Sequence, residues 1–138
     1  LRLKGTAVAT VEPEATVQRV VDTLRQWGIG ALVVSRDGER IDGIVSERDV
    51  VRALGTSELD LLSRPVSQVM TGHVRCCSPT DRVEDLMGLM TEHRIRHLPV
   101  EADGRLVGIV SIGDVVKTRV TELEGEARTL EAYIHHGR

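Results

Sequence analysis

Apolar and polar residues alternate along the chain with two different periods, and the same order of periods occurs twice. In two segments apolar residues recur every three or four positions, which predicts amphipathic helices. These are Val17, Val20, Val21 and Leu24 in the first segment and Val83, Leu86, Met87 and Met90 in the second. Short runs rich in β-branched residues follow each predicted helix, and such runs are typical of strands.

Two Asp-Gly dipeptides separate the predicted strands. The runs 31–35 and 41–45 flank Asp37-Gly38, and the runs 98–100 and 106–110 flank Asp103-Gly104. Asp-Gly favours tight turns between antiparallel strands, so each pair of runs predicts a hairpin. A further helix follows each hairpin directly, with Ser46 or Ser111 as its N-cap, and Thr16 and Asp81 are the predicted N-caps of the two earlier helices.

An internal duplication explains the repeated order. Placing residues 8–34 over 74–100 aligns identical prolines, valines, isoleucines and leucines, and beyond one extra residue in the first copy the run 43–51 matches 108–116. Such self-similarity indicates two copies of one supersecondary unit. Copies this small do not each bury a complete core. We therefore expect an α/β (α+β) fold in which two pseudo-symmetric β-α-β-β-α repeats pack sheet to sheet.

The predicted organisation has three parts. Residues 1–64 form the first repeat with a polar connector at 55–64, residues 65–118 form the second repeat, and residues 119–138 form a C-terminal helical extension. Pro65 is expected at the first helical position of a short turn over 66–70.

The extension carries an apolar stripe with coiled-coil spacing. Its members are Val120, Leu123, Ala127, Leu130 and Ile134. Two interpretations stay open: the stripe packs on its own repeat, or it pairs with a second copy in a homodimer. Trp27, near the end of the first helix, is expected in the core or in an interface.

Composition excludes several classes of partner. The chain has a formal net charge of −3, one Trp, one Tyr and no Phe. The core must be aliphatic, and neither the aromatic platforms nor the basic patches of nucleic-acid binders are present. No apolar run approaches the ~20 residues of a membrane span, and no leader segment is recognisable. We expect no nucleic acid and no membrane as partner.

Cysteine usage favours a reducing, cytoplasmic location. Cys76 and Cys77 are adjacent, and neighbours in a strand point to opposite faces, which is poor geometry for a mutual disulfide. Zinc sites need cysteines at wider, regular spacing, so no metal is expected.

The motif Ser-x-x-Asp stands at the start of the second helix in each repeat, as Ser46 to Asp49 and Ser111 to Asp114. A helix N-terminus suits a phosphate, and an Asp carboxylate accepts hydrogen bonds from a vicinal diol such as that of ribose. Together they describe a nucleotide site. The same pattern is also a capping box that serves helix stability alone.

The repeated run Gly-Ile-Val-Ser-x-x-Asp-Val-Val and the strand ending in Leu-Pro-Val at 98–100 resemble the cystathionine-β-synthase (CBS) domain. The similarity extends over 8–116, and two such domains in tandem form a Bateman module. The resemblance implies an AMP, ADP, ATP, NAD or S-adenosylmethionine ligand in one or two clefts between the repeats. It implies no further cofactor.

The resemblance also implies roles for individual residues. Asp49 and Asp114 would hold ribose, with Ser46 and Ser111 near the phosphate. Arg96 and His97 would bind phosphate in the cleft of Asp114 and Ser111, which makes that cleft the more competent one, because the first repeat has Gly30 and Ala31 at the equivalent positions. The remaining residues of that cleft would be Lys4, Gly5, Ala9, Ile29 and Gly30, and the other cleft would use Ser46, Asp49, Thr71, Arg75, Ile95 and Arg96.

The base would contact the aliphatic side chains of Ile29, Val33 and Ile95. Arg48, Arg52 and Lys117 are either phosphate ligands or solvated helix charges.

No nucleophile–base pair, glycine-rich phosphate loop or metal triad is recognisable, so the chain is not expected to be an enzyme. The predicted function is that of a regulatory sensor, which binds an adenine nucleotide and acts on a separate protein through a change in the cleft or the dimer. The alternative is a structural dimerisation module without ligand.

Overall fold

The protein is described by a computed structural model that covers residues 8–56 and 60–136, with side chains of the last helix up to residue 131. The first repeat contains β1 (Thr10–Val11), α1 (Val17–Trp27), β2 (Ala31–Val34), β3 (Gly43–Ser46) and α2 (Glu47–Gly55). Two short 3-10 turns, η1 (Leu61–Ser63) and η2 (Val66–Gln68), lead to the second repeat. This contains α3 (Val83–His93), β4 (His97–Ala102), β5 (Arg105–Ser111) and α4 (Ile112–His136).

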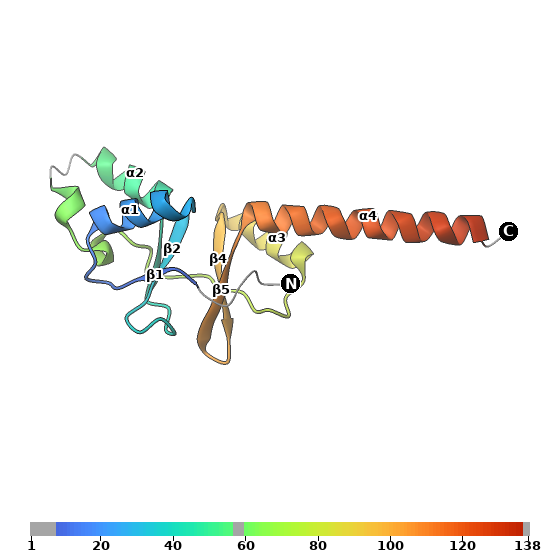
Figure 1. Ribbon diagram of the computed structural model, residues 1–138, viewed down its shortest axis with the longest axis horizontal. Coiled ribbons are helices and arrows are strands. Elements are labelled where there is room, and N and C mark those ends of the chain that lie inside the picture. Colours follow the sequence, from blue (N-terminus) through green and yellow to red (C-terminus); the bar gives the residue numbers. More distant parts are fainter. Residues whose placement is uncertain (1–7, 57–59, 137–138) are drawn as a thin grey trace.

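The duplication extends to the hydrogen bonds of the sheets. In the first repeat β1 runs parallel to β2, with Val11 opposite Val34, and β2 is antiparallel to β3. In the second repeat β4 and β5 form the antiparallel pair, and a single parallel bridge between Cys77 and Val100 takes the place of the first strand. Val11 and Cys77 are equivalent residues, and each carbonyl accepts an N–H at 2.8 Å, from Ser35 and Glu101 respectively. The predicted fold class, two pseudo-symmetric repeats with a long C-terminal helix, is confirmed (Figure 1).

The strands that lie together at the centre of Figure 1, β2 and β4, are buried on both faces. Alternate side chains of a strand point to opposite sides of the sheet. In β2, Leu32 and Val34 belong to the core under the helices, whereas Val33 on the other face is also fully buried. In β4, Leu98 lies in the core and Pro99, on the other face, is fully buried too. This pattern is what sheet-to-sheet packing of the repeats requires.

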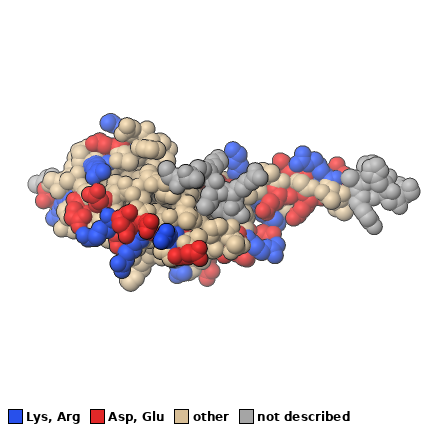
Figure 2. All heavy atoms as spheres, turned by 60° about the horizontal axis from the view of Figure 1, so that its bottom comes forward, with Lys and Arg blue, Asp and Glu red and all other residues tan. Residues whose placement is uncertain are grey.

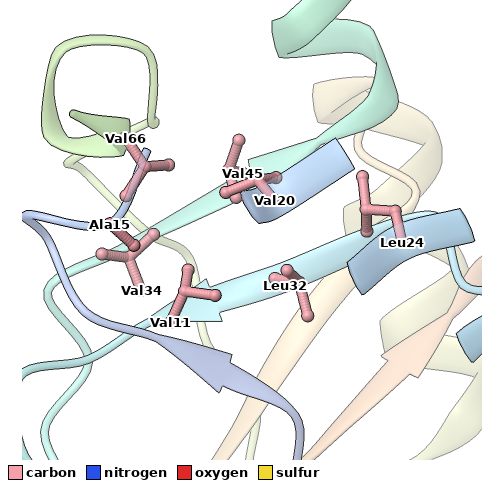
Figure 3. Packing of buried hydrophobic residues seen from close by; sticks show 8 residues of the cluster. All are labelled: Val11, Ala15, Val20, Leu24, Leu32, Val34, Val45 and Val66. Carbon is pink, nitrogen blue, oxygen red and sulfur yellow. The ribbon is translucent and has the colours of Figure 1, made fainter. Parts of the chain in front are cut away.

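Two aliphatic clusters form the core, one in each repeat. Figure 3 shows the first, in which small and branched side chains of α1, the strands and the connector meet. Its members are Val11, Ala15, Val20, Leu24, Leu32, Val34, Val45 and Val66. The second consists of Cys77, Val83, Leu86, Met90, Leu98, Val100, Val110 and Val115. The expectation of an aliphatic core is confirmed, and Trp27 lies outside it with 65% of its surface exposed.

Of three local predictions about helix starts, one is confirmed and two need correction. Thr16 caps α1 as predicted, with its side chain accepting from the N–H of Arg19 at 3.2 Å. Asp81 does not cap α3: the N-cap is Arg82, and the Asp81 carboxylate accepts instead from the N–H of Ser78 at 2.8 Å. Pro65 stands at the N-cap of η2 rather than at its first helical position.

Both hairpins form, but their loops differ. Asp103 and Gly104 have φ angles of 53° and 76°, as a two-residue turn between antiparallel strands requires. In the first hairpin residues 35–42 lie between the strands, and the Asp37 carboxylate accepts the N–H groups of Glu39 and Arg40 at 2.9 and 2.8 Å. The extra residue of the first copy accounts for one residue of this difference, and the shorter strands β2 and β3 account for the rest.

The backbone after η2 lies against the edge of β3. Ile44 and Thr71 exchange two backbone hydrogen bonds of 3.0 and 2.8 Å. Gly43, directly before Ile44, leaves no room for a side chain: a Cβ there would lie 2.5 Å from Met70 Sδ and 2.9 Å from the Thr71 carbonyl oxygen.

We therefore expect Gly43→Ala to lower the free energy of unfolding by about 1–3 kcal/mol, because the backbone of residue 71 must move. Gly88→Ala is the matched control, since nothing lies within 4 Å of a Cβ at this position of α3. Alanine should stabilise the helix there by up to about 1 kcal/mol. Urea unfolding midpoints of both variants give the comparison, and a Gly43→Ala protein as stable as the parent would contradict the expectation.

Candidate functional site

Both Ser-x-x-Asp motifs form complete capping boxes. The Asp49 Oδ2 atom accepts from the backbone N–H of Ser46 at 2.9 Å and from its hydroxyl at 3.1 Å, and the Ser46 Oγ atom accepts in turn from the N–H of Asp49. Asp114 and Ser111 repeat the arrangement, with distances of 3.3 and 2.9 Å to the carboxylate. In both repeats the motif therefore serves as a capping box. The Asp49 Oδ1 atom is not part of the box and faces the Thr71 hydroxyl at 3.5 Å.

The helix N-termini are also tied to the strands behind them. The N–H of Glu47 donates to the carbonyl of Gly30 at 3.0 Å, and that of Ile112 donates to the carbonyl of Arg96 at 2.8 Å. Together with the capping boxes, these bonds occupy three N–H groups at the start of each helix. These bonds leave the N–H groups of Arg48 and Gly113 as the backbone donors for a phosphate in the first turn of each helix, beside the side chains.

A cavity of about 450 Å³ lies beside the start of α2, within the size range of small-molecule sites. It contains every residue predicted for the Asp49 cleft: Ser46, Asp49, Thr71, Arg75, Ile95 and Arg96. Its lining comes from three stretches, 44–52 of the first repeat, 71–75 between η2 and α3 (the connecting segment below) and 93–97 between α3 and β4, together with Gly30. The cavity thus lies between the two repeats.

Several lining residues were not predicted from the sequence: Ile44, Glu47, His73, Val74, His93 and Arg94. Ile44 and Val74 join Ile95 as apolar walls, whereas Val33, one of the predicted walls, is fully buried between the sheets. His73 and Val74 lie between Thr71 and Arg75, both of which were predicted. This position in the sequence was the signal that could have identified them as lining residues. Arg48 and Arg52, left open between two roles, both line the cavity.

The residues predicted for the second cleft are only partly described. Lys4 and Gly5 lie outside the described residues, and Ala9 and Ile29 pack against the first core cluster. His97 stands opposite Ser111 in the β4–β5 pair, near the start of α4.

Arg96 and His97 also line the Asp49 cavity, so they do not by themselves make the Asp114 cleft the better one. The ranking of the two clefts stays a prediction.

His97 explains why the first repeat has glycine where the second has Arg96. A Cβ on Gly30 would lie 3.2 Å from both Cε1 and Nε2 of the His97 ring. A side chain at position 30 would therefore crowd the His97 ring, which would have to move by a few tenths of an ångström.

Burial controls the titration of His97 and of both cysteines. It lowers the pKa of His97 below the ordinary value of 6.5, an effect opposed by the carboxylates of Glu47 and Asp114 and reinforced by Arg96. Burial raises the pKa of the Cys77 thiol to about 11 and also raises that of Cys76. Both thiols are free.

The described part of the chain shows no metal cluster and no spanning helix. No three His, Cys, Asp or Glu side chains within it come together as metal ligands. None of its helices is both long and apolar enough to cross a membrane. On the face shown in Figure 2, basic and acidic side chains are interspersed.

Fold and cavity together define a module of two pseudo-symmetric repeats with a small-molecule-sized cavity between them. The sequence profile of the CBS domain matches residues 5–56 and 66–120, and the chain therefore belongs to the CBS domain family. It is 40% identical over 126 residues to the CBS domain-containing protein CBSX3, mitochondrial, of Arabidopsis thaliana. That match covers 88% of this chain but only 61% of the relative.

Two solved structures show the same fold. The CBS-domain containing protein ATU1752 from Agrobacterium tumefaciens is 44% identical, with a TM-score of 0.79 over 83% of this chain and 91% of its own. The CBS domain protein PAE2072 from Pyrobaculum aerophilum, complexed with AMP, is 32% identical, with a TM-score of 0.72 over 81% of this chain and 85% of its own.

The lowered pKa of His97 predicts a loss of stability in mild acid. The unfolded chain binds the proton first, so the free energy of unfolding falls as the pH drops from 6.5 towards the folded-state pKa. His97→Gln should remove this part of the pH dependence. Urea midpoints at about pH 7.5 and 5.5 measure it, with His93→Gln, at an exposed position, as control. Equal acid sensitivity in His97→Gln and the parent would refute the assignment.

Proposed function

We propose that this protein is a regulatory module that binds an adenine nucleotide in the cavity beside α2. The proposal rests on three kinds of group that line one cavity. These are the Asp49 carboxylate, whose Oδ1 atom is not used by the capping box, aliphatic side chains and several arginines. The AMP complex of PAE2072 supports it, because that protein shares the fold at 32% identity.

Each part of a nucleotide has a chemical counterpart in the lining. The ribose diol would donate to Asp49 Oδ1, with the Thr71 hydroxyl beside it, since a carboxylate accepts both hydroxyl protons. The base would lie against Ile44, Val74 and Ile95, and the phosphate against arginine side chains. Ser46 would position Asp49 through the capping box rather than contact the phosphate itself.

A second nucleotide is proposed for the pseudo-equivalent cleft at Asp114. Ser111, Arg96 and His97 lie beside this carboxylate or on the neighbouring strand. Lys4, Gly5, Ala9, Ile29 and Gly30 would complete the cleft, as the family resemblance implies.

The proposed role is sensing rather than catalysis. A ligand that contacts both repeats favours one relative position of the repeats over others. A partner protein recognises the repeats in that position. The ligand class is AMP, ADP, ATP, NAD or S-adenosylmethionine, and the setting is the cytoplasm, where the free thiols of Cys76 and Cys77 stay reduced.

Calorimetric titration with AMP and ATP tests the ribose contact. Asp49→Asn keeps an acceptor for the capping box but loses the charge, and it should weaken binding by about 1.5–3 kcal/mol. Asp114→Asn is the matched variant for the second cleft, where it should lower the number of bound nucleotides. Unaltered affinity in Asp49→Asn would contradict the proposed site, and a larger loss in Asp114→Asn would restore the order predicted from the sequence.

We further propose a homodimer that involves α4. The helix is tied to α3 through the ion pair of Arg119 with Glu84 at 3.0 Å and then projects past the repeat (Figure 1). The stripe residues Val120, Leu123 and Leu130 are 47, 46 and 60% exposed, which leaves about half of each side chain accessible to a partner. Ala127 is exposed too, and the side chain of Ile134 lies outside the described part.

Trp27, Val51, Leu54 and Val116 add exposed apolar surface on the helices. Val51 and Val116 are equivalent positions of the two repeats, so both repeats present apolar helix faces. A second copy offers the same surface in return, and such self-complementary pairing is common. The same faces favour the second candidate function, a dimerisation module without ligand, which nucleotide titration separates from the first.

Leu123→Glu combined with Leu130→Glu places charges on the stripe and should weaken the dimer by tenfold or more, about 1.4 kcal/mol or above, while nucleotide binding persists. Thr121→Glu with Thr129→Glu adds the same charges on the opposite side of α4 and should leave the dimer intact. Sedimentation over a dilution series measures both. A monomeric parent protein, or an unchanged dimer in the leucine double variant, would end the proposal.

A further inference from the structure

The arginines of the cavity differ from many of the others in their ion pairing. Six arginines elsewhere in the described structure pair with carboxylates: Arg25, Arg36, Arg64, Arg82, Arg105 and Arg119. Five line the cavity, and none of these five pairs with a carboxylate of a described residue: Arg48, Arg52, Arg75, Arg94 and Arg96. Positive charge is thus concentrated at the cavity, and these five guanidinium groups form no ion pairs with described carboxylates.

The lining contains only two carboxylates, Glu47 and Asp49, against these five guanidinium groups. One oxygen of Asp49 is already engaged by the capping box. The whole chain has a formal net charge of −3, so the cavity opposes the overall sign. Like charges gathered around one space repel each other, and a polyanion relieves that repulsion.

The five side chains surround the cavity from three segments. Arg48 and Arg52 are four residues apart on α2, which places them on one face of the helix. Arg75 comes from the connecting segment, and Arg94 and Arg96 come from the turn between α3 and β4. A row of phosphates would be contacted from both repeats at once.

The turn of Arg94 supplies an independent observation. Arg94 ends α3 with a φ of 54°, in the left-handed region, where the first repeat has Gly28 with a φ of 62°. Residues with side chains adopt this conformation less readily than glycine, although it is a usual way for a helix to end. The Arg94 carbonyl accepts from Nη1 of Arg48 across the gap between the repeats at 3.4 Å.

From this charge and geometry we infer that the cavity selects nucleotides with two or more phosphates over AMP, adenosine and the cationic S-adenosylmethionine. The inference rests on the proposed function and narrows its ligand class. One phosphate accepts a bidentate contact from one or two arginines, whereas five guanidinium groups match an oligophosphate chain.

Calorimetric titration with adenosine, AMP, ADP and ATP tests the inference. We expect the affinity to rise roughly tenfold or more from AMP to ATP and to depend more steeply on salt for ATP than for adenosine. Arg48→Gln with Arg52→Gln should weaken ATP roughly tenfold to a hundredfold and change adenosine less than about twofold. Arg19→Gln, an exposed helical arginine outside the cavity, is the control and should change neither.

The outcomes separate this inference from the proposed function. Equal affinities for AMP and ATP would overturn the inference while the nucleotide site stands. If no nucleoside or nucleotide binds, the proposed function fails, and tripolyphosphate then tests the arginines alone. A rise in melting temperature with tripolyphosphate that Arg48→Gln with Arg52→Gln removes supports an oligophosphate site, and no rise overturns it. Should that variant not fold, Arg75→Gln with Arg96→Gln takes its place, and unchanged ATP binding in it overturns the inference.

Discussion

One hydrogen bond in each repeat decides where the site forms. The first N–H of the second helix donates to the carbonyl directly before the middle strand, Glu47 to Gly30 and Ile112 to Arg96. The bond fixes the capped helical turn beside the beginning of the strand. Asp49, the arginines of α2 and the residues before β4 consequently meet at one edge of the sheets, which is where the cavity lies.

The meeting of the repeats at this edge also breaks their symmetry. The ring of His97 lies beside Gly30, so a side chain at position 30, such as an equivalent of Arg96, would crowd it. The turn before the middle strand therefore supplies arginines from one repeat only: Arg94 and Arg96 come from the second repeat, whereas Gly28 and Gly30 occupy the equivalent positions of the first. The glycine at position 30, which interrupts the repeat in the sequence, therefore suits the close approach of His97.

Local signals predicted most of the fold, and contacts between distant segments account for what was missed. Helical spacing, the Asp-Gly turns and the Thr16 cap depend on neighbours in sequence, and they were confirmed. The prediction of Asp81 as a helix cap was wrong because it rested on the good capping propensity of Asp. The residue equivalent to Thr16 in the second repeat is Arg82. The prediction of Val33 as a wall of the site was wrong because the sequence does not tell which face of a strand packs against the other sheet.

The cavity residues that escaped prediction illustrate the same limit. His73 and Val74 reach α2 only because Thr71 pairs with Ile44 of β3, a contact between segments far apart in the chain. His93 and Arg94 line the cavity because α3 ends where the repeats meet.

The two core clusters are separate, and this separation suits the proposed sensor role. Each cluster joins helices to one face of its own sheet, whereas the opposite faces, with Val33 and Pro99, join the repeats. A small sliding of one sheet face on the other leaves both clusters closed, and packed layers commonly move in this way. A ligand bound by residues of both repeats then has a different affinity for each relative position, which is the condition for a shift in population. With one continuous core, the same movement of the repeats would require the core to repack. Ligand binding in the cavity would then not change the relative position of the repeats.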